Sequence, residues 1–229
     1  MTGTLIETQR RPVALQALPH ADLLPAPLRR PLVGVLVAAV GVFVALAVTV
    51  AHTSAAGTLD LWAYGFIADH HSLRSPWMQL AVTFGEPATV VVVALAVTVV
   101  SLATGRRRLA ALAVLGPGLT GIVTEVLKPI IGRTIADGSF AFPSGHTAGA
   151  TAIGLLLAIA LAGLMRQNRV AGLVALLAAT VVGAGVVGVG LVNERAHYPT
   201  DTVGGLATAV IVTLTCALVI DRVAHGLHR

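Results

Sequence analysis

Six stretches of the chain are apolar over a length that can cross a membrane. A bilayer-spanning helix needs about 20 mostly apolar residues. The stretches that meet this requirement cover residues 31–51, 77–103, 109–127, 147–165, 170–192 and 202–220. The pattern predicts an all-α polytopic membrane protein in which six transmembrane helices form one bundle.

The remaining residues form short connections and two tails. Residues 1–30 are rich in proline and have no periodic apolar pattern, which predicts a flexible tail. Residues 221–229 are a second, short tail, so 31–220 is the predicted domain. Between the first two spans, apolar residues at helical spacing predict a short interfacial helix: Leu59, Trp62, Ala63, Phe66 and Ile67. This helix belongs either to an aromatic membrane belt or to a lip over a lipid site.

The composition supports a membrane protein. Apolar residues make up 56% of the 229 residues and charged residues only 11%, whereas soluble domains carry about 25% charged residues. With a mean hydropathy of +0.88, this excludes a disordered chain and argues against a cytosolic domain. The net charge of +5 does not indicate a nucleic-acid partner, because the bases lie between apolar runs instead of forming one patch. Cys216 is the single cysteine, which excludes an intramolecular disulfide framework and a cysteine zinc cluster.

The basic residues predict an orientation in the membrane. Counted on alternate sides of the spans, one side holds Arg10, Arg11, Arg29, Arg30, Arg106, Arg107, Arg108, Arg166, Arg169, Arg222 and Arg229. The other side holds only Arg74, Lys128, Arg133 and Arg195. Because cytoplasmic loops carry the excess of Lys and Arg, both termini are predicted to be cytoplasmic in a multi-pass protein of the cell membrane. The loops on that side are too short for a domain, so the chemistry is expected on the extracytoplasmic face.

Two junctions on this outer face hold most of the polar residues suited to chemistry. The first runs from Lys128 and Arg133 to Pro143-Ser144-Gly145-His146 at the start of the fourth span. The second is Arg195-Ala-His197-Tyr-Pro-Thr-Asp201 at the start of the sixth. Each residue alone has an ordinary structural explanation. Together, in a chain with few charges, they are costly for a membrane protein and indicate a functional site.

The first junction has the properties of an anion site. Ser144 is a favoured N-cap residue, and the first turn of a helix leaves backbone N–H groups unpaired at the positive end of its dipole. Gly145 has no side chain to keep an anion from these donors. His146 lies beside them and can exchange a proton near neutral pH. Glu125, one turn before Lys128, is expected to pair with that lysine.

The second junction pairs a histidine with a carboxylate. Pro199 suits the first position of a helix, which makes Tyr198 the expected cap and places Asp201 in the first turn. Asp201 can then reach back to His197. A carboxylate on one ring nitrogen leaves the other nitrogen available as a base or nucleophile.

These motifs resemble those of the type-2 phosphatidic acid phosphatase family, which is related to vanadium haloperoxidases. The family signature has a Lys with a later Arg-Pro, then Pro-Ser-Gly-His, then a Ser-Arg before His-x-x-x-Asp. In this chain Lys128 is followed by the complete Pro143-Ser144-Gly145-His146 and by His197-Tyr-Pro-Thr-Asp201. The six spans also match, so the resemblance covers about residues 31–220.

The chain departs from the signature at two places. The family Arg-Pro falls where this chain has Ile135-Ala136, and the nearest base is Arg133. The family Ser-Arg falls at Gly190-Leu191, and the nearest base is Arg195. Arg133 and Arg195 are therefore the expected replacements in phosphate binding.

The resemblance implies a lipid phosphate phosphatase that works through a phosphohistidine. His197 is the implied nucleophile, oriented by Asp201, and His146 is the implied acid and base. Lys128, Arg133, Ser144, Gly145 and Arg195 are the implied phosphate ligands. No metal and no cofactor are implied. The substrate would be a membrane lipid phosphate, with a polyprenyl diphosphate first and phosphatidic acid or phosphatidylglycerol phosphate next.

Two other functions stay open at the level of the sequence. The phosphohistidine could pass its phosphate to another lipid or a sugar, which would make the chain a phosphotransferase. The chain could also be a lipid-phosphate binder or transporter that has lost catalysis. The sequence does not indicate an oligomeric state.

Overall fold

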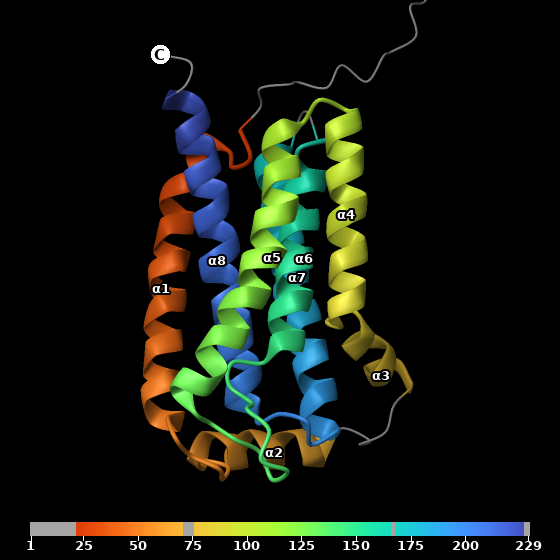
Figure 1. Cartoon of the computed structure of the whole chain (residues 1–229). Coiled ribbons are helices and arrows are strands. Elements are labelled where there is room, and N and C mark those ends of the chain that lie inside the picture. Colours follow the sequence, from red (N-terminus) through yellow and green to blue (C-terminus); the bar gives the residue numbers. More distant parts are fainter. Residues whose placement is uncertain (1–21, 71–75, 166–167, 227–229) are drawn as a thin grey trace, which may run out of the picture.

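The computed structural model describes residues 22–70, 76–165 and 168–226. Within these ranges the secondary-structure elements are all helices. Long helices run side by side in a bundle, and α2 lies across one end of it (Figure 1). The helices are α1 (Ala26–Val50), α2 (Thr58–His70), α3 (Pro76–Thr83), α4 (Pro87–Ala103), α5 (Arg107–Ile131), α6 (Gly145–Ala162), α7 (Arg169–Asn193) and α8 (Pro199–Gly226).

The predicted six-span all-α fold is confirmed, with one span broken. Five of the described helices are long and apolar enough to cross a membrane, and α3 with α4 passes the same test as a pair bent by 59°. The sequence pattern predicted one continuous span over 77–103. The break falls before Pro87, because a proline disfavours helical geometry in the residue preceding it. Glu86 accordingly has extended backbone angles, with ψ at 139°.

The bundle is built around α8 and exposes apolar side chains on its outside. α8 contacts α1, α2, α5, α6 and α7. Valines such as Val48 and Val182 are 75% and 66% exposed, as expected for helices that face lipid. Small residues let the inner helices approach closely. Gly149 and Gly188 show this, because a Cβ on either would press against Val90 or Thr202.

The first helix begins earlier than the predicted domain. α1 starts at Ala26, within the residues expected to form the tail, and Leu23 and Leu24 just before it are buried. Their N–H groups donate to the carboxylate of Asp221 over 2.9 and 3.1 Å. Proline is compatible with the first turn of a helix, which needs no intrahelical N–H donors, so Pro27 does not prevent this start. At the other end α8 continues through Asp221 to Gly226, and the rest of the expected N-terminal tail, 1–21, lies outside the described residues.

The start of α1 and the end of α8 lie at the same end of the bundle, opposite α2 (Figure 1). This agrees with an even number of crossings. Which side of the membrane this end occupies remains the prediction made from the basic residues.

Candidate active site

The first turns of α6 and α8 meet at the end of the bundle that α2 crosses. The Ser144 N–H donates a hydrogen bond to the backbone carbonyl of Asp201 over 3.0 Å. Gly205, one turn further along α8, packs against the Ser144 carbonyl so closely that a Cβ there would lie under 3.0 Å from it. The two junctions that the sequence singled out are therefore neighbours in space.

The start of α6 has the geometry expected of an anion site. Ser144 is its N-cap, and its hydroxyl accepts the Thr147 N–H at 3.4 Å and contacts the Thr147 hydroxyl at 3.2 Å. Ser144 is fully buried. The N–H groups of Gly145 and His146 donate to no group in the described parts of the chain. These two free donors stand at the positive end of the helix dipole.

Lys128 reaches this anion site from the last turn of α5. Its Nζ lies 3.8 Å from the point where a Cβ of residue 145 would stand, and Glu125 Oε1 lies at the same distance. The expected pairing is confirmed, because Lys128 Nζ and Glu125 Oε1 are 2.6 Å apart. The lysine is thus close to the free N–H groups but carries a carboxylate partner of its own.

The start of α8 holds the histidine and the aspartate as the sequence predicted. α8 begins at Pro199, and the Tyr198 N–H donates to Asp201 Oδ2 over 2.8 Å. The same Oδ2 lies 3.6 Å from His197 Nδ1, which is too long for a hydrogen bond. Catalytic hydrogen bonds are often long before substrate binds. The carboxylate faces Nδ1, which leaves Nε2 as the free ring nitrogen.

The two histidines are within range of each other's charge. His146, in the first turn of α6, is half-buried and interacts electrostatically with His197. The charges of Glu86, Lys128 and Glu194 also act on it. Gly85, in the bend between α3 and α4, packs against the backbone of His146. The bend of the broken span thus packs against the first turn of α6.

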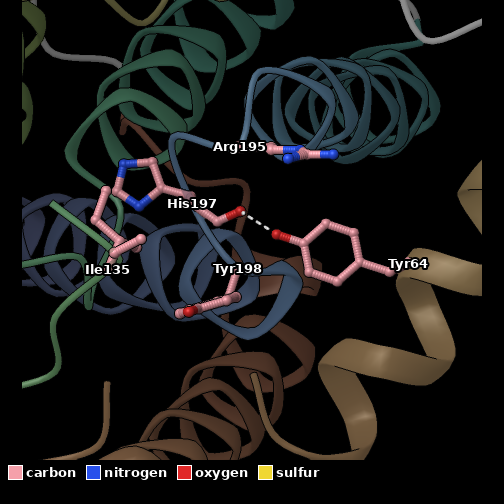
Figure 2. A pocket seen from close by; sticks show the side chains of 6 residues that line it. Tyr64, Ile135, Arg195, His197 and Tyr198 are labelled. Atoms are coloured by element: carbon pink, nitrogen blue, oxygen red, sulfur yellow. Dashed lines mark hydrogen bonds between the residues drawn. The ribbon is translucent and has the colours of Figure 1, made fainter. Parts of the chain in front are cut away.

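A pocket of 180 Å³ opens beside His197 (Figure 2), and its lining residues are Tyr64, Ile135, Ala136, Arg195, His197 and Tyr198. The Tyr64 hydroxyl donates to the His197 carbonyl over 3.3 Å. Burial, and then the charges of Tyr198 and of nearby carboxylates, raises the pKa of Tyr64, so this hydroxyl keeps its proton. The Arg195 side chain points away from the His197 ring, toward the side of the pocket where Tyr64 lies (Figure 2).

Arg133 is buried among protein groups, away from the pocket beside His197. Its side chain is 1% exposed, and it is absent from the pocket lining. Nη2 lies 2.6 Å from Asp60 Oδ2, and Nη1 donates to the Thr200 hydroxyl over 2.9 Å. Nε lies 3.2 Å from Asp201 Oδ1, without the angle of a hydrogen bond. All three nitrogens thus face protein groups, and phosphate binding by Arg133 stays a prediction from the sequence.

Residues 133–224 match the family model of the PAP2 superfamily. The chain is thus similar to the PAP2 superfamily over these residues, which make up less than half of its length. The crystal structure of "the first transmembrane PAP2 type phosphatidylglycerolphosphate phosphatase from Bacillus subtilis" aligns with 84% of this chain and 95% of its own, with a TM-score of 0.58 and 20% identity. The PAP2 membrane fold is therefore shown. No curated protein matches the sequence.

The positions at which the chain departs from the PAP2 signature have distinct surroundings. Ile135 and Ala136, which replace the Arg-Pro, line the pocket beside His197. Leu191, which replaces the arginine of Ser-Arg, is buried with Val82 and Val187. One missing arginine thus leaves an apolar pocket wall, and the other is replaced by core packing.

Sequence reasoning missed Asp60, which lies outside the segment matched by the PAP2 model. Its carboxylate is 1% exposed and accepts from Arg133, from the Thr200 N–H at 2.9 Å and from the Gly57 N–H at 3.0 Å. Burial opposes ionisation, but these hydrogen bonds outweigh it and lower the pKa of Asp60. The available signal was that Asp60 is the single charged residue in 53–68.

No group of three or more His, Cys, Asp or Glu side chains that could hold a metal ion occurs among the residues that the structure describes. The free N–H groups at the start of α6 and the Lys128 ammonium are donors that suit a phosphate, and the carboxylates of Asp201, Glu86 and Glu194 also act on the two imidazoles.

Proposed function

We propose that this chain is an integral-membrane lipid phosphate phosphatase that works through a phosphohistidine on His197. One observation carries the proposal: the contact between Ser144 and Asp201 brings the first turns of α6 and α8 together. That contact puts two imidazoles, a helix N-terminus and a pocket at one end of a membrane bundle. The PAP2 fold supports the same reaction class.

In the first step, His197 Nε2 attacks phosphorus and the bond from phosphorus to the leaving oxygen breaks. Asp201, which faces Nδ1, stabilises the positive charge that develops on the ring. His146 gives its proton to the leaving oxygen. In the second step, water attacks phosphorus, the P–N bond breaks, and His146 takes the proton of that water. The products are the dephosphorylated lipid and inorganic phosphate, and both imidazoles return to their initial state.

Phosphate binding is assigned to the free N–H groups of Gly145 and His146 and to the positive charge of Lys128, while Arg195 supplies positive charge on the Tyr64 side of the pocket. These donors would act on the phosphoryl oxygens, where charge resides in the transition state. Ser144 contributes by capping α6, since its hydroxyl is buried against Thr147. Arg133 is reassigned from the phosphate to the support of Asp201.

The substrate is proposed to be a lipid whose phosphate lies at the membrane interface. Leu59, Trp62 and Phe66 on α2 are each more than half exposed, as suits a helix in contact with lipid next to the pocket. A polyprenyl diphosphate, phosphatidic acid and phosphatidylglycerol phosphate are the substrates to compare. The similar Bacillus subtilis structure is that of a phosphatidylglycerolphosphate phosphatase. The site is proposed to face the extracytoplasmic side.

The test is phosphate release by detergent-purified protein from a panel of these three lipids. We expect release to continue in EDTA, to be lost in His197→Ala and to fall strongly in His146→Ala. Asp137→Asn is the matched control, since Asp137 is exposed in the loop next to the pocket residue Ala136. Undiminished turnover in His197→Ala would refute the nucleophile. Phosphate found on an added lipid or sugar acceptor instead of in solution would identify a phosphotransferase.

A second candidate is a lipid-phosphate binder without hydrolysis. One observation favours it: the pocket beside His197 has the apolar side chain of Ile135 where the family signature has arginine. Binding of the same lipids by wild-type protein, with no phosphate released from any of them, would favour this candidate over the phosphatase.

A further inference from the structure

A buried carboxylate on α2 holds the first turn of α8 from outside the matched PAP2 segment. Asp60 Oδ1 accepts the backbone N–H of Thr200, and Asp60 Oδ2 is 2.6 Å from Arg133 Nη2. Gly57 N–H donates to the same Oδ2. Both oxygens are thus used, and neither faces the pocket. A buried charge is tolerated when it is paired and hydrogen-bonded, and Asp60 satisfies both conditions.

Arg133 extends this link from Asp60 to the catalytic carboxylate. Its Nε lies 3.2 Å from Asp201 Oδ1, on the side of the carboxylate opposite His197. Its Nη1 donates to the Thr200 hydroxyl, and its guanidinium carbon lies 4.5 Å from the centre of the Tyr198 ring. The arginine therefore contacts three residues of the α8 start and is itself held by Asp60.

The orientation of Asp201 determines which nitrogen of the His197 ring is free to react. Asp201 Oδ2 accepts the Tyr198 N–H and faces His197 Nδ1, while Oδ1 faces Arg133. A rotation of this carboxylate would remove the group that orients Nδ1. Displacements of about 1 Å near reacting groups cost about 100-fold in rate.

We propose that Asp60 is a positioning residue for the reaction, which acts through Arg133 on Asp201 and so on His197. This inference rests on the proposed phosphatase function and extends it to a helix beyond the PAP2 match. Asp60 is 1% exposed and does not line the pocket, so its removal should lower the rate of the chemical step and leave substrate binding unchanged. If Asp60 served only to stabilise the fold, its removal would lower the amount of folded protein but leave the kcat and KM of the folded fraction unchanged.

The experiment measures kcat and KM for phosphate release by folded, detergent-purified wild type, Asp60→Asn, Arg133→Met and the double variant. For Asp60→Asn we expect kcat to fall about 10- to 100-fold with KM within about twofold of wild type. Because Asp60 acts through Arg133, the double variant should be no slower than Arg133→Met alone. Asp137→Asn, an exposed carboxylate near the pocket, is the control and should match wild type.

Several results would overturn the inference. A wild-type kcat in folded Asp60→Asn, or a loss confined to KM, contradicts positioning. A double variant whose loss equals the product of the two single losses contradicts action through Arg133. If Asp60→Asn does not fold, Asp60→Glu is measured in its place, because glutamate keeps the charge but cannot keep both oxygens in position. A lowered kcat with unchanged KM in Asp60→Glu supports the inference, and a wild-type kcat overturns it.

The failure of this inference can be told apart from the failure of the proposed function. An inactive wild type overturns both. An active wild type with a fully active Asp60 variant overturns the inference alone.

Discussion

Replacing Gly205 by alanine should separate the first turns of α6 and α8. A Cβ at residue 205 would lie under 3.0 Å from the Ser144 carbonyl oxygen and 3.2 Å from the Ala148 nitrogen. Ordinary Cβ contacts begin at 3.4 Å, and both neighbours are backbone atoms, so the helices must move apart by about one ångström. Overpacking of this kind costs about 1–3 kcal/mol of stability. Because Ser144 and Asp201 are hydrogen-bonded across this contact, the shift also moves His146 relative to His197.

The assay compares thermal unfolding and phosphate release for Gly205→Ala and Gly183→Ala. Gly183 lies on α7 with no atom within 4 Å of its would-be Cβ, so that alanine should cost nothing and can raise stability by about 1 kcal/mol through helix propensity. For Gly205→Ala we expect a lower melting temperature and a kcat reduced about 10-fold or more, since misplacement by 1 Å costs about 100-fold. If Gly205→Ala unfolds and turns over like the wild type, the two helix starts do not form the site.

Three further outcomes follow from the charges at the site. Glu125→Gln removes the carboxylate 2.6 Å from Lys128, so that the full charge of the lysine can act on the phosphate. Because this ion pair is exposed, KM should fall by only about two- to fivefold. A raised KM in steady-state assays would contradict the assignment of Lys128 to phosphate binding. Ile135→Arg places a cation in the pocket wall and should lower KM about tenfold, because a hydrogen bond to a charged group contributes about 1.5–3 kcal/mol; unchanged affinity would show that this wall does not face the phosphate. The pKa of Asp60 is below its ordinary value of 3.8, so its contribution to stability is present above that pH and is lost as the pH falls through the lowered pKa. Melting temperatures measured from pH 7 down to pH 2 should therefore drop more steeply in wild type than in Asp60→Asn, and parallel curves would refute the link.

The features that the sequence predicted well are those encoded locally. Span lengths follow from runs of apolar residues, and the starts of α6 and α8 follow from Ser144 as a cap and Pro199 as a first helical residue. The pairing of Glu125 with Lys128 is also local, since the two are three residues apart on one helix. For the two helix starts and the ion pair, the interacting groups lie within about one helical turn.

The features that the sequence did not reveal depend on contacts between distant residues. Asp60 and Arg133 are 73 residues apart, and nothing local to Arg133 shows that a buried carboxylate holds it. Because Arg133 lies close to a phosphate motif in the sequence, the sequence predicts that it binds phosphate. The early start of α1 depends likewise on Asp221, which accepts the Leu23 N–H from 198 residues away.

The phosphohistidine mechanism is tested most directly by locating the phosphoryl group during turnover. Wild-type protein is mixed with a lipid substrate labelled in its phosphate, quenched at alkaline pH, digested and mapped by mass spectrometry. The proposed mechanism predicts a phosphohistidine at residue 197 that forms faster than phosphate is released and is absent from His197→Ala. Turnover with the label on another residue, or with no labelled protein at any time, would contradict it.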